Sequence, residues 1–413
     1  MNIRLSVLLA GIYAITLLSC GENQSKESGS AAADTSKIKG TYAYDADFLK
    51  QHTSKVVELI SPDSTGKVLL SADYQGRVMT STAMGDTGTS FGWLNYNLIS
   101  SGEKKKSFNP VGGEERFWLG PEGGQYSLYF KKGDSFNISK WQVPGFIDTV
   151  SYDIVNSSAS SASFSKSATL VNYSGTQFAL NVNRTISLLD KGALENKLGT
   201  SLPESVKFVG YETANKLQNT GKKEWNKKTG LVSVWLLAML TPSEKTTIIV
   251  PFRPRKNIKS FITDNYFGEI PAGRLDVKDS VLFFRADGKY RSKIGLAPQV
   301  AKSVAGSYDF EKNVLSLIFF PVEPDKEYVN SKWELQKQPY KGDVANAYND
   351  GPLADGTQMG PFYEIESSSP GIALEPSATY EYKQTSCHLQ GSYEDLRAIA
   401  QKVLGIDLNN LKK

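Results

Sequence analysis

One stretch of the chain places charged and aromatic side chains where they can act on the same surface. It runs from Phe108 to Phe130 and reads FNPVGGEERFWLGPEGGQYSLYF. Side chains alternate between the two sides of a strand, so Arg116 and Trp118 share one face. Pro121 and the nearby glycines predict a tight turn into a second strand, which places the carboxylate of Glu122 near that face. These groups can stack on and hydrogen-bond a polyhydroxylated ring; a plain hairpin with a surface ion pair is the alternative.

A second group of carboxylates lies near the end of the chain. Glu364 and Glu366 flank a single isoleucine in the stretch PFYEIESSSP, so both carboxylates point to the same side of a strand. Proline, glycine and tyrosine surround them, which favours a cleft where a carboxylate can act as a general base. Asn349 and Asp350 precede this stretch and are candidate ligand-binding residues, although such a pair more often forms a turn.

The candidate cationic groups follow a glycine turn in the stretch ADGKYRSKIG. Arg291 and Lys293 share one face of the strand predicted there. A buried lysine can have its pKa lowered enough to donate a proton, and an arginine fork can bind the carboxylate of an acidic sugar. Two solvated cations on an exposed strand are the alternative.

The tryptophans divide by their surroundings. Trp118 and Trp141 stand beside polar turns, and we expect them to stack on a sugar ring. Trp235 lies within an apolar run and is predicted to belong to the core. His388 is a lone histidine in a predicted strand, and a structural role is the stronger interpretation of such a residue.

The composition is that of an ordinary globular protein. The 413 residues are 40% hydrophobic and 22% charged, with a formal net charge of +4. Charges of both signs are interspersed along the sequence, and no cluster of basic residues is arranged to follow a phosphate backbone. This argues against nucleic acid as a partner. The sequence contains no Gly-rich phosphate loop, no paired Cys/His spacing and no nucleophile elbow, so neither a metal nor another cofactor is expected.

The N-terminus resembles a bacterial lipoprotein signal. Arg4 precedes an apolar run from Leu5 to Leu18, and Ser19 and Cys20 follow it. This pattern predicts a signal peptide over residues 1–19, cleavage before Cys20 and lipidation of its sulfur, with residues 20–40 as a flexible tether. Gly21 in place of aspartate favours the outer membrane, where the lipid would be the only membrane anchor. A plain secretory signal with an accidental cysteine is the alternative.

Short runs of β-branched and aromatic residues, separated by turn signals, occupy most of the chain. They predict an all-β fold, a large antiparallel β-sandwich, as a single domain over residues 41–413. The apolar run Leu231–Leu240 suits a strand buried on both faces. Ser157–Ala168 is interpreted as a strand, with a linker between two domains as the alternative. A short helix is predicted over residues 392–405, where Ser392 is a good N-cap.

Three stretches together resemble galactose mutarotase-like (aldose epimerase-like) proteins. The acidic stretch Met359–Pro370, the turn at Leu374–Ser377 and the strand TYEYKQTSCHLQG resemble the closing segment of that family. Gly112–Glu122 resembles an early hairpin of its epimerase-like members. As a whole, roughly Lys55 to Gly391 resembles a group of uncharacterised bacterial lipoproteins of this superfamily. The resemblance implies a β-supersandwich that presents a concave face to a carbohydrate.

The resemblance also implies roles for individual residues. Glu366 best matches the glutamate that takes the proton of the anomeric hydroxyl group, and Glu364 is the second choice. The family also uses two histidines from the middle of the chain, but this sequence has only His52 and His388, and neither matches. Arg291 or Lys293 would then serve as the electrophile.

We therefore expect an exported lipoprotein that binds a carbohydrate and acts on it as an epimerase-like or other carbohydrate-active enzyme. Arg291 suits an acidic carbohydrate as the ligand. A non-catalytic carbohydrate-binding protein is the first alternative. A polysaccharide lyase, in which Arg291 would neutralise a uronate, is the weaker one.

Overall fold

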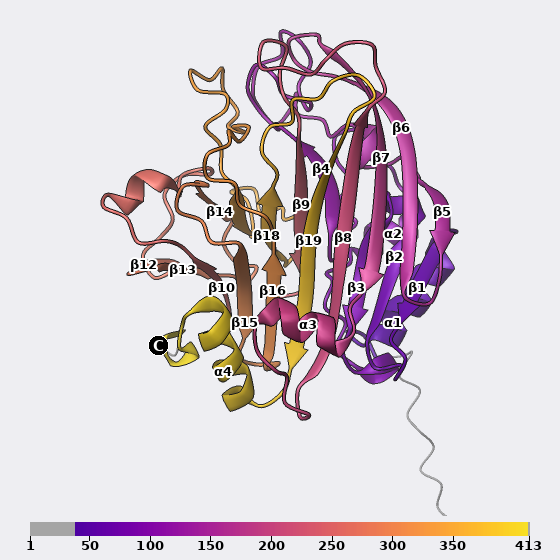
Figure 1. Ribbon diagram of the computed structural model, residues 1–413, viewed down its shortest axis with the longest axis vertical. Coiled ribbons are helices and arrows are strands. Elements are labelled where there is room, and N and C mark those ends of the chain that lie inside the picture. Colours follow the sequence, from indigo (N-terminus) through magenta and orange to yellow (C-terminus); the bar gives the residue numbers. More distant parts are fainter. Residues whose placement is uncertain (1–37, 412–413) are drawn as a thin grey trace, which may run out of the picture. The chain divides into compact units, whose positions relative to one another are not determined.

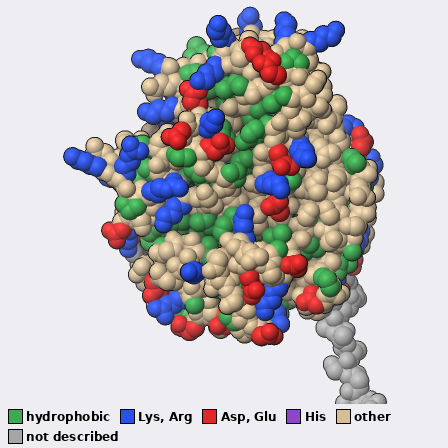
Figure 2. Space-filling view, in the orientation of Figure 1, with side chains coloured by type: hydrophobic (Ala, Val, Ile, Leu, Met, Phe, Trp, Pro, Cys, Tyr) green, Lys and Arg blue, Asp and Glu red, His purple; other side chains and the backbone are tan. Residues whose placement is uncertain are grey.

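A computed structural model describes residues 38–411 of the chain (Figure 1). The predicted signal peptide (residues 1–19), the lipidation residue Cys20 and most of the predicted tether lie outside the described residues. Charged side chains of both signs are distributed over the face seen in Figure 2.

The described chain is mostly β-structure in three antiparallel sheets, which confirms the predicted all-β fold. The largest sheet has ten strands in the spatial order β12 (Leu275–Lys278), β13 (Val281–Arg285), β10 (Thr246–Pro251), β15 (Val304–Asp309), β16 (Val314–Phe319), β19 (Thr379–Gln390), β8 (Lys207–Asn219), β7 (Gln177–Leu188), β6 (Ser161–Val171) and β5 (Asp153–Ser157). A six-stranded sheet has the order β11 (Ile262–Thr263), β14 (Ser292–Leu296), β17 (Ala345–Asn349), β18 (Tyr363–Ser368), β9 (Ser233–Leu240) and β4 (Arg116–Gly120). A three-stranded sheet consists of β1 (Val56–Ile60), β2 (Lys67–Ser71) and β3 (Arg77–Thr82).

The ten-stranded and six-stranded sheets pack face to face. On β18 the odd-numbered side chains point inward, where Tyr363 hydrogen-bonds Ser307 of β15 over 2.8 Å and Ser367 donates to Gln384 of β19 over 2.6 Å. Ile365 lies between them in the main apolar core. Because strand side chains alternate, the even-numbered residues of β18 point to the outer face of the six-stranded sheet.

Strand β9 is the apolar run predicted to be buried on both sides, and every one of its residues is buried. It pairs with β18 on one side and β4 on the other, with Trp235 opposite Trp118 and Leu237 opposite both Glu366 and Arg116. This register places Trp235, Arg116, Trp118 and Glu366 on the same outer face. Trp235, predicted to be only a core residue, is therefore also part of that face.

The predicted C-terminal helix is α4 (Tyr393–Leu404), and it begins and ends where the sequence indicated. Ser392 caps it by accepting from the backbone N–H of Asp395, and Gly405 ends it in the left-handed conformation at φ 73°. Its apolar side packs on the outer face of the ten-stranded sheet together with α3 (Lys191–Leu198), as Figure 1 shows.

Two further helices are α1 (Tyr42–His52) and α2 (Tyr96–Ser101). Asp45–His52 by its sequence indicates one or two helical turns, whereas α1 has 11 residues. Helices α2 and α3 are too short to show a helical period in the sequence. Within residues 38–411 no helix is both long and apolar enough to cross a membrane.

The predicted hairpin at Phe108–Phe130 is wrong. Its first strand exists as β4, but Gln125–Phe130 forms no strand, and β4 pairs with β9 instead. The returning segment packs across the end of β4, where the Tyr129 hydroxyl donates to the carbonyl of Leu119 over 2.9 Å. Gly123 lies so close to residues 331–332 that a Cβ there would meet the Lys332 carbonyl at 2.2 Å. The glycines thus serve loop packing rather than a two-strand turn.

The serine-rich stretch Ser157–Ala168 is confirmed as β-structure. It spans the end of β5 and most of β6, which continue the ten-stranded sheet. Its serines alternate with inward-facing residues such as Phe164, which is fully buried.

Candidate functional site

Four charged residues from three strands meet on the outer face of the six-stranded sheet. They are Arg116 of β4, Lys293 of β14, and Glu364 and Glu366 of β18, and we call them the carboxylate centre. Glu364 and Glu366 share this face because they are two residues apart on one strand. Strands β17 and β9 flank β18, so β14 and β4 bring the two cations in from opposite sides.

Glu366 is held by two donors on a single oxygen. Nζ of Lys293 lies 2.9 Å from its Oε2, and the indole nitrogen of Trp235 donates to the same oxygen over 2.9 Å. The ammonium of Lys293 also lies 4.9 Å from the ring centroid of Trp235. The other oxygen of Glu366, Oε1, is buried and makes no hydrogen bond with a described residue.

Glu364 forms an ion pair with Arg116. Burial raises the pKa of Glu364 to about 7, with Arg116 opposing the rise and the Glu366 carboxylate adding to it. Arg116 in turn lies 4.7 Å from the ring centroid of Trp118. A carboxyl group with a pKa near neutrality can both give and take a proton at physiological pH.

Lys293 does not have the lowered pKa that a lysine acid requires. Burial alone would lower the pKa of its ammonium, but the carboxylates of Glu366 and Glu122 raise it above the ordinary value. The expectation that burial prepares Lys293 to donate a proton is therefore wrong. Its role in the structure is that of a fixed cation beside Glu366.

The predicted aromatic residues surround this centre. Trp118 lies edge-on to Trp235 at 5.4 Å between ring centroids, and Trp141 stacks on Trp333 at 5.9 Å. Glu122 interacts electrostatically with both Lys293 and Glu366; burial raises its pKa, while Lys293 lowers it. Trp118, Glu366 and Lys293 thus lie on one side of the sandwich.

Trp333 was missed in the sequence, although it carries the same signal as Trp141, a lone tryptophan in a polar loop. Trp141, Trp333, Glu122 and Arg291 are partly exposed, whereas Glu364 and Glu366 are buried beneath them.

Arg291 stands at the border of this face. Its guanidinium lies 4.0 Å from the ring centroid of Phe267, and its Nε donates to the hydroxyl of Tyr348 over 3.2 Å. Tyr348 donates in turn to Asp350 over 2.6 Å. The terminal nitrogens of Arg291 form no hydrogen bond or ion pair within residues 38–411, so they are available to an anionic group.

Asn349 does not belong to this face, which corrects its prediction as a ligand-binding residue. Being next to Tyr348 on β17, it points the opposite way, accepts from the backbone N–H of Gly288 and donates to the carbonyl of Tyr290, each over 2.8 Å. It supports a turn, as the alternative interpretation held. Asp350 is buried as well, and it accepts from the Tyr348 hydroxyl and from the backbone N–H of Gly360, the latter over 3.0 Å.

Several buried polar atoms of this face lack a partner among the described residues. They are Nε and Nη1 of Arg116, the indole nitrogen of Trp118 and Oε1 of Glu366. Buried polar groups in folded proteins are almost always hydrogen-bonded. Three donor atoms and one acceptor atom beside aromatic rings are thus free to form hydrogen bonds with a polar ligand.

A second carboxylate cluster lies between the sheets. Glu114 accepts from Ser81, Tyr211 and His388 over 2.8 to 2.9 Å, and the second nitrogen of His388 bonds Ser316 over 2.7 Å. Beside it, the buried pair Arg184–Glu115 is 3.0 Å long. His388 thus has the structural position expected of it. The exposed His52 forms a hydrogen bond with the backbone carbonyl of Phe48 in its own helix. It is no part of the carboxylate centre.

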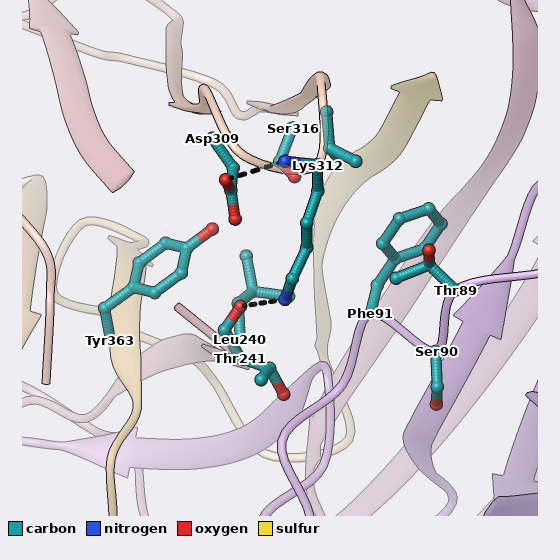
Figure 3. Close-up of a pocket in the computed structure, with 10 residues that line it drawn as sticks. Thr89, Ser90, Phe91, Leu240, Thr241, Asp309, Lys312, Ser316 and Tyr363 are labelled. Atoms are coloured by element: carbon teal, nitrogen blue, oxygen red, sulfur yellow. Dashed lines mark hydrogen bonds between the residues drawn. The ribbon is translucent and has the colours of Figure 1, made fainter. Parts of the chain in front are cut away.

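Two cavities lie outside the carboxylate centre, since none of its four residues lines either of them. The smaller, of about 20 Å³, is lined by residues including Asp309, Lys312, Ser316 and Tyr363 (Figure 3). It has room for about one water molecule. Lys312 closes it by donating from Nζ to the carbonyl of Thr241 over 3.4 Å.

The larger cavity, of about 740 Å³, lies between α1, α2 and the Met359–Pro361 loop. A cluster of Trp93, Tyr348 and Phe362 packs between it and Glu364. Its buried carboxylate, Asp45, is already bonded by Ser90 and Tyr96. The polar groups of the carboxylate centre are less completely satisfied, so we take the carboxylate centre as the candidate site. Over residues 38–411, no group of three or more His, Cys, Asp or Glu is placed to hold a metal ion.

The described chain is an all-β sandwich, and a solved galactose mutarotase-like structure is similar to it. A galactose mutarotase-like protein from Lactobacillus casei ATCC 334 is similar with a TM-score of 0.49 and 10% identity, over 81% of this chain and 99% of that one. A protein from Synechocystis sp. PCC 6803 has a TM-score of 0.49 and 12% identity, over 83% and 98% of the two chains. A candidate aldose 1-epimerase from Escherichia coli K12 has a TM-score of 0.48 and 11% identity, over 82% and 100%. Each similarity extends over more than four fifths of this chain, and at such identities it concerns the fold alone.

The chain belongs to a family of unknown function, DUF6786, which matches residues 40–413. No curated protein sequence matches it significantly.

Proposed function

We propose that the outer face of the six-stranded sheet binds a carbohydrate and that Glu364 and Glu366 exchange protons with it in an epimerase-like reaction. The observation that carries the binding is the set of unpaired polar atoms on Arg116, Trp118 and Glu366 beside indole rings. A sugar ring presents an apolar face and many hydroxyl groups, so it can stack on an indole while its hydroxyls bond these atoms. A purely apolar ligand would leave them unsatisfied.

The two carboxylates support the chemistry because their surroundings differ. Glu366 is paired with the Lys293 ammonium and keeps Oε1 free to accept a proton. Glu364, with its pKa raised to about 7, can supply one. Two titratable groups in unlike environments are the usual arrangement of a base and an acid. Glu364 thereby takes the role of general acid, for which this chain has no matching histidine.

In this proposal the sugar ring opens and closes with a balanced exchange of protons. Oε1 of Glu366 takes the proton of the anomeric hydroxyl as the C1–O1 double bond forms and the C1–O5 bond breaks. Glu364 gives its proton to O5. Rotation about C1–C2 followed by the reverse transfers yields the other anomer and restores both carboxyl groups. Positioned acid and base groups of this kind each contribute on the order of 10²- to 10⁴-fold in rate.

Arg291 supports an acidic sugar as the ligand. Its terminal nitrogens form no hydrogen bond or ion pair with the described part of the chain, and a guanidinium binds carboxylate or phosphate through two parallel hydrogen bonds. The other cations of the site, Arg116 and Lys293, are already paired with carboxylates. Arg291 is therefore the residue that would distinguish a charged sugar from a neutral one.

A non-catalytic binding protein is the second candidate function. It is favoured by the ion pairs themselves, because Glu364 and Glu366 are both held by buried cations and a fixed carboxylate transfers protons less readily. In that case the same rings and polar atoms would hold the sugar without changing it.

The experiment uses the chain that begins after Thr35. Binding is screened on a glycan array, and interconversion of anomers is followed by NMR for the sugars that bind. We expect Glu366→Gln to lower the interconversion rate at least about 100-fold while binding changes by less than about tenfold. Trp118→Ala should weaken binding itself.

Glu212→Gln is the matched control, because Glu212 is a partly exposed carboxylate also paired with a lysine, Lys383. This variant should leave both measurements unchanged. An equal rate of anomer interconversion in wild type and Glu366→Gln would refute the enzymatic proposal and favour a non-catalytic binding protein. Unchanged binding in Trp118→Ala would remove the site.

We also propose that the protein is exported and anchored by a lipid on Cys20, in the outer membrane. The support is the sequence pattern before Cys20. In cells fed a labelled fatty acid, the wild-type chain should carry the label and Cys20→Ser should not. Label on the Cys20→Ser chain would refute this proposal, and the buried Cys387 makes a second acylation site an unsuitable explanation.

A further inference from the structure

Four loops gather at one end of the sandwich and bring together lysines that are scattered in the sequence. They span residues 103–109, 121–143, 222–230 and 330–341, and we call them the lysine-rich end. Side-chain hydrogen bonds to backbone carbonyls join each loop to the next: Gln142 to Lys106 (3.0 Å), Gln125 to Gln336 (3.0 Å) and Tyr340 to Lys227 (2.6 Å). The loops therefore form one continuous surface.

This surface carries more positive charge than the whole chain. It contains thirteen lysines and five carboxylates, whereas the formal net charge of the entire protein is +4. The lysines are Lys104, Lys105, Lys106, Lys131, Lys132, Lys140, Lys222, Lys223, Lys227, Lys228, Lys332, Lys337 and Lys341. All but Lys332, which is half-buried, are exposed. Figure 2 shows blue side chains gathered along the upper end of the molecule, where these loops lie in Figure 1.

Most of these charges are not neutralised by the protein. Of the thirteen lysines, only Lys227 forms an ion pair within the described chain, with Glu327. Exposed lysines elsewhere do have partners, for example Lys383 with Glu212 and Lys289 with Glu244. Like charges held close together repel, so a surface of this kind favours an anionic partner.

The lysine-rich end borders the candidate site. The loop at 121–143 supplies Glu122 and Trp141, and the loop at 330–341 supplies Trp333, which stacks on Trp141. A polymer with one unit at these tryptophans would therefore extend directly over the lysines. A single sugar is too small to reach most of them.

We infer that the lysine-rich end binds an acidic polysaccharide, one whose units carry carboxylate or sulfate groups. Lysine ammonium groups on flexible stems act as point charges and make no geometric demand, which suits a flexible polyanion. The choice of a polysaccharide over other polyanions rests on the function proposed above, because the same loops carry the sugar-stacking tryptophans. Such binding weakens steeply with salt, since exposed charges are screened beyond about 8 Å at physiological ionic strength.

The test uses polygalacturonate as the probe and dextran, a neutral polymer, as its control. One variant changes six loop lysines to glutamine: Lys131, Lys132, Lys140, Lys332, Lys337 and Lys341. A matched variant changes six lysines outside these loops: Lys191, Lys197, Lys207, Lys216, Lys278 and Lys402. Binding is measured at low and at physiological salt, with thermal unfolding as a check on folding.

We expect wild type to bind polygalacturonate but not dextran, the loop variant to bind at least about tenfold more weakly and the matched variant to stay within about twofold. Equal weakening by both variants, or no binding of polygalacturonate, would overturn the inference. So would tighter binding to double-stranded DNA or to anionic phospholipid vesicles than to polygalacturonate, since a different polyanion would then be the partner.

Trp118→Ala separates this inference from the proposed function. If the candidate site binds no sugar, the polymer should still bind through the lysine-rich end, and Trp118→Ala should leave its affinity within about threefold. If monomeric galacturonate binds wild type while the polymer gains nothing over it, the proposed site stands and the lysine-rich end does not contribute.

Discussion

Residues 114–116 contribute to two clusters of buried carboxylates, which lie on opposite faces of the six-stranded sheet. Glu114 and Glu115 point between the sheets, where they meet His388 and Arg184. Arg116, the next residue, points to the outer face and pairs with Glu364. The inner cluster joins the two sheets, and the outer one forms the candidate site.

A perturbed pKa does not distinguish the two clusters. Burial raises the pKa of Glu115 in the inner cluster just as it raises that of Glu364 in the outer one. Unpaired polar atoms occur in both as well, for example Oε2 of Glu114 and Oε1 of Glu366. What differs is access: Arg184 and Glu115 have fully buried side chains, whereas the side chain of Lys293 is 12% exposed and partly exposed tryptophans lie above it. Solvent access beside aromatic rings is therefore the better guide to function here.

The largest expected effect is on the inner cluster. Arg184→Met leaves the Glu115 carboxylate buried without its cation, and we expect the free energy of unfolding to fall by about 3–5 kcal/mol. Urea denaturation measures it. Lys383→Met, which breaks the exposed pair with Glu212, is the control and should cost less than about 1 kcal/mol. A loss below 1 kcal/mol for Arg184→Met would mean that the inner cluster does not join the sheets.

The outer cluster should instead make the free energy of unfolding depend on pH. The pKa of Glu364 is about 7 in the folded chain against a reference value of 4.5, so the folded state holds this proton more tightly than the unfolded state. The stability that it contributes is complete below pH 4.5 and is lost as the pH rises through 7, by roughly 3 kcal/mol. Urea denaturation from pH 4 to 8 should show this decline in wild type and not in Glu364→Gln. Parallel pH curves for the two proteins would contradict the assignment.

The smallest expected effect concerns the hydroxyl that bonds His388 in the inner cluster. Ser316→Ala removes this hydrogen bond, and we expect a loss of about 1 kcal/mol in the free energy of unfolding. Sugar binding on the outer face should not change. A binding defect in this variant would show that the two clusters are coupled through the sheet, and the contrast between them would fail.

The period of a strand accounts for what the sequence predicted well. Arg116 and Trp118 share a face, as do Glu364 and Glu366, because each pair is two residues apart. The apolar run at β9 was recognised as a doubly buried strand for the same local reason.

Long-range contacts account for what was missed. The partner of β4 is β9, more than a hundred residues away, and a nearby turn motif could not reveal it. In a continuous apolar run the alternation is hidden, so nothing indicated that Trp235 faces Glu366. The direction of the pKa shift at Lys293 depends on carboxylates from two distant segments. The lysine-rich end was missed because its four loops lie far apart in the sequence and come together only in the fold.

The ion pair between Arg116 and Glu364 joins residues 248 positions apart. As the chain leaves the ribosome, Arg116 is therefore made long before Glu364, the partner in its ion pair. Contacts of such separation form late, and an unpaired sheet edge invites association with other chains while it waits. For a protein of this design, the period between synthesis of β4 and synthesis of β18 is when assistance from a chaperone matters most.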